Sequence, residues 1–254
     1  MLELNKLYNM DCMDGMKEIP DKYFDLAIVD PPYGGGSSQN GNVEREKDCK
    51  ADTPTLSNET DRGLEGGLTT TISVERTGGG YFKKYLPRGG VFSNMQEDTN
   101  IKHWDVAPTQ EYFDELARVS KNQIIWGGNY FNLPPTRCFL IWRKLTISEN
   151  FSMAMCEYAW TSFNDNAKLF ECVPQGNKEK RFHPTQKPIA LYHWIISRYA
   201  KEGDKILDTH AGSGSCLIAA HDTKHDFVGF EIDKFYYQSA QERIQRHFAQ
   251  TSLF

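Results

Sequence analysis

The chain has 254 residues, 39% of them hydrophobic and 25% charged, a composition typical of a globular protein rather than a disordered or collagen-like one. Its six cysteines form no C-x-x-C pair, which argues against a disulfide framework or a zinc ribbon and favours a reducing, cytoplasmic compartment. The first residues lack the features of a secretory signal, and no apolar run is long enough to span a bilayer. We therefore expect no membrane insertion.

The net charge of −5 argues against a surface that coats nucleic acid non-specifically, because neutralising phosphates requires clustered lysines and arginines. A local basic groove remains compatible with this charge. Two basic patches are present, one at Lys83, Lys84 and Arg88 and the other at Lys178, Lys180, Arg181 and Lys187. Taken alone, each patch is better explained as a solvated face balanced by nearby acids.

The composition of the chain changes abruptly within the first 108 residues. Residues 4–10 predict a short strand, residues 11–16 a turn, and the apolar run 24–29 a strand buried on both faces, as in parallel sheets. Residues 34–108 then contain 12 of the 20 glycines and few apolar runs. We interpret this segment as a long glycine-rich insertion in a single domain that covers residues 1–254.

Regular patterning returns at Thr109, the expected N-cap of a helix with apolar residues at helical spacing up to Val119. Strands are predicted over 123–126, 139–143 and 157–162, and Pro188 is expected to open a second helix. A strand over 205–208, a helix through 217–220, a strand over 227–230 and an amphipathic helix over 234–248 follow. This alternation predicts an α/β fold with a doubly wound, mostly parallel, Rossmann-like sheet.

The segment 208–214, with the sequence DTHAGSG, lies between a predicted strand and a predicted helix. Glycines there let backbone N–H groups approach a ligand, and Glu231, about twenty residues on, is placed for ribose hydroxyls. The pattern favours a nucleoside cofactor over the alternative that Gly212 and Gly214 merely turn the chain. It is not G-x-G-x-x-G, and alone it does not separate a nicotinamide enzyme from a methyltransferase.

A second motif, Asp30-Pro31-Pro32-Tyr33, directly follows the apolar strand. The prolines stiffen the backbone and remove two N–H donors, so the Asp30 carboxylate and the Pro31 carbonyl can converge as acceptors. Such a pair suits the amino group of adenine or cytosine, whose nitrogen becomes a better nucleophile when its N–H groups are held. Tyr33 offers a flat face for stacking a base. The alternative is a proline-stiffened loop in which Asp30 forms a turn.

Four segments together carry a resemblance: DPPY at 30–33, HPTQKP at 183–188, DTHAGSG at 208–214 and GFEID at 229–233. In this order they resemble the motifs of S-adenosylmethionine-dependent DNA amino methyltransferases of the circularly permuted beta group. The resemblance covers about residues 1–33 and 109–250, leaving the insertion unmatched. Thr209 and His210 stand where the family usually has Pro and Phe, and we assign His210 no role in proton transfer.

The resemblance implies a role for each matching position. Asp30, Pro31, Pro32 and Tyr33 would form the catalytic motif. Asp208 and residues 211–214 would hold the methionine part of the cofactor, Glu231 its ribose and Asp11 its adenine edge. Thr185, Gln186 and Lys187 would lie against the methionine carboxylate. The cofactor-binding set is therefore Asp11, Thr185, Gln186, Lys187, Asp208, Ala211, Gly212, Ser213, Gly214 and Glu231.

The implied activity is methylation of the exocyclic N6 of adenine in double-stranded DNA, by in-line attack of a base flipped out of the duplex and without a metal. Adenine is favoured because cytosine-N4 members more often carry Ser before the two prolines. Cytosine-N4 methylation, methylation of RNA or of a protein amide, a nicotinamide oxidoreductase and a catalytically silent DNA-binding subunit are the alternatives.

The resemblance also bears on partners. Similar enzymes commonly dimerise, which favours a homodimer, and they occur in restriction–modification systems, although the sequence specifies no restriction partner. Residues 163–183 are too few for an independent recognition domain. We therefore expect the 34–108 insertion to close over DNA, with Lys83, Lys84 and Arg88 contacting phosphates, the alternative being a lid with no part in recognition.

Overall fold

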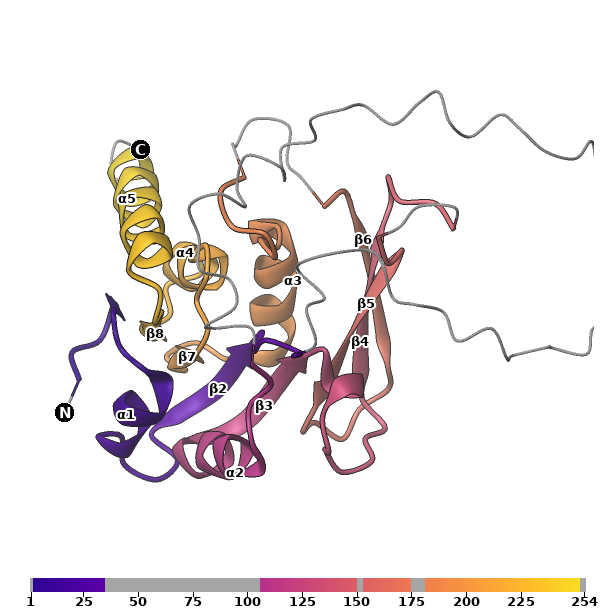
Figure 1. Ribbon diagram of the computed structural model, residues 1–254, viewed down its shortest axis with the longest axis horizontal. Coiled ribbons are helices and arrows are strands. Elements are labelled where there is room, and N and C mark those ends of the chain that lie inside the picture. Colours follow the sequence, from indigo (N-terminus) through magenta and orange to yellow (C-terminus); the bar gives the residue numbers. More distant parts are fainter. Residues whose placement is uncertain (1, 35–105, 150–152, 175–180, 252–254) are drawn as a thin grey trace, which may run out of the picture.

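The computed structural model describes residues 2–34, 106–149, 153–174 and 181–251 (Figure 1). The strands are β1 (Lys6–Tyr8), β2 (Phe24–Val29), β3 (Ser120–Trp126), β4 (Phe139–Lys144), β5 (Cys156–Thr161), β6 (Lys168–Cys172), β7 (Ile206–Asp208) and β8 (Phe227–Phe230). The helices are α1 (Cys12–Lys17), α2 (Gln110–Val119), α3 (Ile189–Tyr199), α4 (Ser215–Asp222) and α5 (Lys234–Thr251), with a 3-10 turn η2 (Gly128–Tyr130). None of the helices in the described ranges is long and apolar enough to cross a bilayer.

The strands form one sheet in the order β1-β8-β7-β2-β3-β5-β4-β6. The five strands from β1 to β3 run parallel, β5 is antiparallel to both of its neighbours, and β4 and β6 are parallel to each other. From β7 the chain continues to β8 on one side, and from β2 it continues to β3 on the other. The boundary between β7 and β2 is therefore a topological switch point, where α/β sheets bind ligands at the carboxyl ends of their strands.

Helices cover both faces of the sheet (Figure 1). Leu26 and Ile28 of β2 join a core with α3, α4 and α5, whereas Ala27 and Val29 join a second core with α1 and α2. Successive side chains of a strand point to opposite faces, so a strand covered on both sides must be apolar throughout. The structure thereby confirms the predicted α/β, mostly parallel sheet and the predicted bounds of β2 and β8.

Two local predictions near the first helices need correction. Residues 11–16 were expected to form a turn, but they begin helix α1, because the Asp11 carboxylate caps it by accepting the N–H of Met13 at 2.7 Å. Gly15 serves packing, since a Cβ there would lie 2.4 Å from the Phe230 ring. Thr109 does occupy the N-cap position of α2, but its hydroxyl makes no capping hydrogen bond.

Strand β6 was not predicted at all. It lies within the stretch 163–183 that was judged only for its length, and it pairs in parallel with β4. Its side chains alternate between half-buried and exposed, and Lys168 and Glu171 interrupt its apolar character. A short edge strand with this composition gives little periodic signal.

Candidate active site

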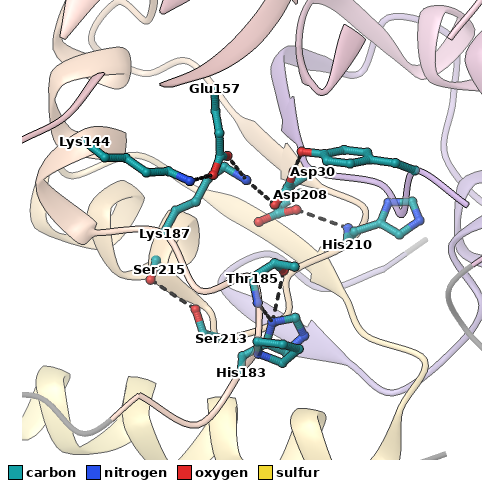
Figure 2. Close-up of polar contacts among 12 residues, drawn as sticks. Asp30, Lys144, Glu157, His183, Thr185, Lys187, Asp208, His210, Ser213 and Ser215 are labelled. Carbon is teal, nitrogen blue, oxygen red and sulfur yellow. Dashed lines mark hydrogen bonds and ion pairs between the residues drawn. The ribbon is translucent and has the colours of Figure 1, made fainter. Parts of the chain in front are cut away.

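The DPPY and DTHAGSG motifs meet at one edge of the sheet. Asp30 directly follows β2, Asp208 ends β7, and these strands are adjacent and parallel. Glu231 follows β8, the next strand outward. The three carboxylates therefore lie at the carboxyl edge beside the switch point, and Figure 2 shows Asp30 and Asp208 close together.

Asp30 is held from two sides. The Tyr33 hydroxyl donates a hydrogen bond to its Oδ1 at 2.9 Å, and the Lys187 ammonium binds its Oδ2. Pro31 is buried and Pro32 half-buried, so the turn carrying the carboxylate is packed in place. Burial raises the pKa of Asp30 above its usual value, and Lys187 opposes that rise. A carboxylate has about four acceptor positions, so Asp30 can still accept a further hydrogen bond.

Behind Asp30 stands a row of alternating charges, which we call the ion-pair row: Asp30, Lys187, Glu157 and Lys144 (Figure 2). Lys187 Nζ lies 3.1 Å from Glu157 Oε2, and Lys144 Nζ lies 2.6 Å from Glu157 Oε1. Glu157 is the second residue of the antiparallel strand β5 and Lys144 ends β4, so both lie at the edge where β2 ends. Neither residue carried a functional prediction: Glu157 was only part of the predicted strand 157–162, and Lys144 lay one residue beyond the predicted strand 139–143.

The contacts within the row favour the charged forms of Glu157 and Lys187. Burial alone would raise the pKa of Glu157, but Lys187 and Lys144 outweigh it and hold that pKa at about 2. Burial would lower the pKa of Lys187, but Asp30 and Glu157 raise it above its usual value. Lys187 also lies 5.3 Å from the centre of the Trp126 ring. Lysine and carboxylate thus stay ionised in a place where either alone would tend to be neutral.

The HPTQKP segment links the two motifs. Its Lys187 reaches Asp30, while the His183 ring lies against Gly212, where a Cβ would come within 3.2 Å of it. Thr185 contacts His183 Nδ1, and Gln186 accepts the N–H of Phe182 at 3.4 Å. The predicted contact of residues 185–187 with a methionine carboxylate stays a prediction; the Lys187 ammonium is bound here by two carboxylates.

The glycine loop is tightly built. Gly212 and Gly214 have φ values of +51° and +74°, which residues with a side chain rarely adopt. Gly214 directly precedes α4. The Gly212 N–H donates to Glu231 at 2.9 Å. From α5, Arg243 donates to the Ser213 carbonyl at 2.8 Å. Arg243 had no sequence signal beyond its place in an amphipathic helix, yet it anchors the loop.

Asp208 and Glu231 are buried against backbone N–H groups rather than cations. Asp208 accepts the N–H of His210 at 3.1 Å, and Glu231 accepts those of Gly212 and Asp233, both at 2.9 Å. Burial raises the pKa of Asp208 to about 8 and that of Glu231 to about 7. Such carboxylates suit a ligand that brings a positive charge and hydroxyl donors.

Histidine and aspartate near the loop have structural partners. Burial lowers the pKa of His210 to about 4 and that of His183 to about 3, so both rings are neutral at pH 7. Thr209 shares a hydrogen bond of 2.6 Å with the Tyr112 hydroxyl, and the His210 ring packs edge-on against Tyr112. Asp11 follows β1 and uses its carboxylate as the cap of α1.

The structure describes only Arg181 and Lys187 of the two basic patches. Lys83, Lys84 and Arg88 lie outside the described residues, as do Lys178 and Lys180. Lys187 is buried in the ion-pair row, and Arg181 is half-buried and donates to the carbonyls of His183 and Pro184. The interpretation as a solvated face is therefore wrong for Lys187, which is buried and bound by Asp30 and Glu157.

The family of this chain follows from its match to a protein-family model. The N6_N4_Mtase model, described as DNA methylase, matches residues 91–242, more than half of the chain. The chain belongs to the N6/N4 DNA methylase family. The match includes the cofactor loop and the HPTQKP segment, and it begins inside the glycine-rich insertion.

Several curated relatives are type II methyltransferases. The chain is 38% identical over 83 residues to M.HpaI of Haemophilus parainfluenzae, covering 33% of this chain and 26% of that one. It is 22% identical over 244 residues to M.BamHI of Bacillus amyloliquefaciens, covering 91% and 55%. It is 23% identical over 273 residues to M1.MboII of Moraxella bovis, covering 94% and 96%. The chain thus spans about half or less of the first two relatives.

Solved structures share the fold. The PvuII DNA methyltransferase, described as cytosine-N4-specific, superposes with a TM-score of 0.53 at 11% identity, covering 96% of this chain and 91% of that one. M1.HpyAVI, solved in complex with SAM, gives 0.50 at 17% identity, covering 94% and 98%. At these identities the likeness supports the α/β methyltransferase fold alone.

Proposed function

We propose that this protein is a site-specific, S-adenosylmethionine-dependent DNA methyltransferase that methylates the exocyclic N6 of adenine in double-stranded DNA. The observation that carries the proposal is the buried Asp30 carboxylate at the switch point, one strand away from the glycine loop. A carboxylate acceptor beside a nucleoside site is what methylation of a ring amine requires.

The residues present fit the proposed cofactor. Its ammonium, sulfonium and ribose hydroxyls match the buried carboxylates Asp208 and Glu231, whose pKa values stay raised because their present partners offset burial only in part. The positive φ of Gly212 and its closeness to His183 leave little room for a side chain at that position. When bound, S-adenosylmethionine supplies an activated methyl group. Asp208, residues 211–214 and Glu231 would hold it, with Asp11 at its adenine edge.

The chain's own contribution to the reaction is acceptor chemistry at Asp30. Its carboxylate accepts a hydrogen bond from the target amino group, which favours a nitrogen with a localised lone pair. The Pro31 carbonyl is the second acceptor. The amine loses its proton only once the nitrogen carries positive charge, so Asp30 need not be a strong base. The Lys187 ammonium favours the ionised form of this carboxylate and so opposes the effect of burial.

Tyr33 is proposed to receive a flipped base, and its ring is already stacked. Tyr130 lies 4.7 Å from it, centre to centre, at an interplanar angle of 16°. Tyr130 is 62% exposed and belongs to η2, preceded by Gly127 at a φ of +67°. An incoming base would therefore either displace Tyr130 or enter between the two rings. Extrusion of the base costs a few kcal/mol, which stacking can offset.

The test is product analysis. Purified protein is incubated with labelled cofactor and mixed-sequence duplex DNA, and the DNA is digested to nucleosides. We expect N6-methyladenine. N4-methylcytosine would overturn the adenine assignment while keeping the amino-methyltransferase chemistry. Competition with RNA and peptides tests the remaining acceptors, and transfer to either in preference to DNA would contradict the proposal.

Sequence recognition is proposed to involve residues 34–108, with Lys83, Lys84 and Arg88 on phosphates; these three residues lie outside the described part of the chain. A deletion within this segment in a still-folded protein should lower DNA affinity and relax site preference. Unchanged affinity and preference would contradict it. A homodimer is proposed from the resemblance, and sedimentation of the free protein measures it.

A further inference from the structure

The ion-pair row extends two residues beyond the groups that the proposed reaction uses. Glu157 and Lys144 belong to none of the four motifs, yet they continue the line of charge from Asp30 through Lys187 (Figure 2). The side chains of Asp30, Lys187, Glu157 and Lys144 are only 13%, 3%, 24% and 7% exposed. At this burial, solvent screens the charges weakly, so a change at one end of the row is felt at the other.

We propose that Glu157 and Lys144 are positioning residues that divide Lys187 between two carboxylates and thereby set how acidic the medium can become before Asp30 loses its acceptor role. The inference rests on the proposed function for the role of Asp30. The contacts that carry it do not depend on that function, since Lys187 binds both Asp30 and Glu157.

The direction of each effect follows from electrostatics. Without the negative charge of Glu157, the Lys187 ammonium is left to Asp30, and Asp30 also loses the repulsion of a nearby carboxylate. The pKa of Asp30 should then fall. Without Lys144, Glu157 draws more strongly on Lys187, and the pKa of Asp30 should rise. The two substitutions therefore act in opposite directions.

Other ionisable groups also act on Asp30 from the surrounding elements. They are Tyr33 on its own loop, Tyr112 on α2, Tyr192 on α3 and Asp208 on β7. Burial raises the pKa of each of the three tyrosines above its usual value, so they stay neutral across the working range. Arg181 acts on Glu157. Both substitutions leave these side chains in place, but Glu157→Gln also removes a charge that acts on Tyr33, Tyr192 and Arg181.

The experiment measures kcat/KM for DNA methylation against pH in wild type, Glu157→Gln and Lys144→Met. We expect the acid limb to move down by about one pH unit in Glu157→Gln and up by about one unit in Lys144→Met. Lys144→Arg keeps the charge and should restore the wild-type limb. Lys121→Met is the matched control, because it breaks an exposed pair with Asp25 on the same strand as the catalytic turn.

The double variant sharpens the test. Lys144 is inferred to act mainly through Glu157, so Lys144→Met should shift the acid limb less in the Glu157→Gln background than in wild type. The double variant is also the safer one to fold, because it leaves no buried lysine or glutamate of the outer pair without a partner. A Lys144→Met shift as large in the Glu157→Gln background as in wild type would overturn the inference.

A second readout needs neither DNA nor cofactor. In protein labelled with ¹³C at aspartate carboxyls, the Asp30 signal is assigned by its loss in Asp30→Asn and titrated in each variant. The titration should move in the same directions as the acid limb. Shifts of equal sign, or no shift, would overturn the inference. Opposite shifts in a protein that methylates no DNA would support the row and overturn the proposed function instead.

Discussion

The two halves of the carboxyl edge hold buried carboxylates in opposite ways. On the catalytic side, Asp30 and Glu157 are bound by lysine ammonium groups. On the cofactor side, Asp208 and Glu231 are bound by backbone N–H groups. The two glutamates show the consequence most clearly, since the pKa of Glu157 is held at about 2 and that of Glu231 is raised to about 7.

The difference shows that the kind of partner, more than burial itself, decides the charge of these groups. Backbone N–H groups only partly replace water around a buried carboxylate, whereas two ammonium groups more than replace it. Glu157 is therefore fully compensated by cations before any ligand binds, whereas burial still raises the pKa of Asp30. The cofactor side is complete only with a ligand that brings positive charge, which is what the proposed cofactor does.

The largest expected effect is at Asp30. Asp30→Ala removes the acceptor for the target amine and should lower kcat by about a hundredfold to a thousandfold or abolish turnover. Affinity for S-adenosylmethionine, measured by calorimetry, should change little, because Asp208 and Glu231 remain. Asp30→Asn is the control that keeps the shape. Turnover retained in Asp30→Ala would remove Asp30 from the mechanism.

The contrast between Glu157 and Glu231 can be tested by measuring the free energy of unfolding against pH. Glu231 has a raised folded-state pKa, so its contribution is fully present below pH 4.5 and is lost as the pH rises through about 7. Glu157 has a lowered folded-state pKa, so its contribution to stability is present above pH 4.5 and is lost as the pH falls through about 2. Each contribution is worth about 3 kcal/mol.

Urea unfolding of the ligand-free protein between pH 3 and 8 measures both slopes. Glu231→Gln should flatten the decline between pH 4.5 and 7, with Asp208 retaining part of it because its pKa is raised to about 8. Glu157→Gln should flatten the loss that begins below pH 4.5. Slopes of the same sign for the two glutamates would contradict the contrast between the halves.

On the cofactor side, the glycine loop tests the geometry. Gly212→Val should weaken cofactor binding by about tenfold to a hundredfold, because the residue must keep a φ of +51° and would press on the His183 ring. Gly203→Val is the matched control, since Gly203 also has a positive φ but open space around its Cβ position. Equal affinity in Gly212→Val and wild type would place the cofactor elsewhere.

On the catalytic side, Tyr130 tests the route of the base. Tyr130→Ala should raise the KM for DNA by about tenfold, because stacking on an aromatic ring is worth about 1–3 kcal/mol per base. Tyr130→Phe keeps the ring and should behave like wild type. If Tyr130→Ala lowers the KM instead, Tyr130 obstructs the base, and the base enters by displacing it.

The fold was predictable because it depends on patterns within short stretches of sequence. The run 24–29 is apolar since both faces of β2 are covered, and the alternation of strands and helices specifies a parallel sheet. Helix α1 was mistaken for a turn because Asp11 and Gly15 are common in turns as well as at helix caps. In the structure, Gly15 packs against a phenylalanine ring from a strand distant in the sequence, which leaves no space for a side chain.

The candidate site was predictable only where its residues lie in motifs. Asp30 and Asp208 could be placed at strand ends, and adjacency of β2 and β7 brings them together. Glu157 and Lys144 could not be found in this way, since single charges at strand ends are ordinary surface features. Their meaning depends on Lys187, whose partner Asp30 lies 157 positions away in the chain.

The smallest expected effect concerns Asp11, which is proposed to serve both the fold and the cofactor. Asp11→Ala removes the cap of α1 and should lower the free energy of unfolding by about 1 kcal/mol. Asp11→Asn keeps the cap, since asparagine is an equally good N-cap, but removes the charge. If Asp11 contacts the adenine edge, both variants weaken S-adenosylmethionine binding, while only Asp11→Ala destabilises the fold. Wild-type cofactor affinity in Asp11→Asn, together with lower stability in Asp11→Ala, would leave Asp11 as a helix cap alone and narrow the cofactor side to Asp208 and Glu231.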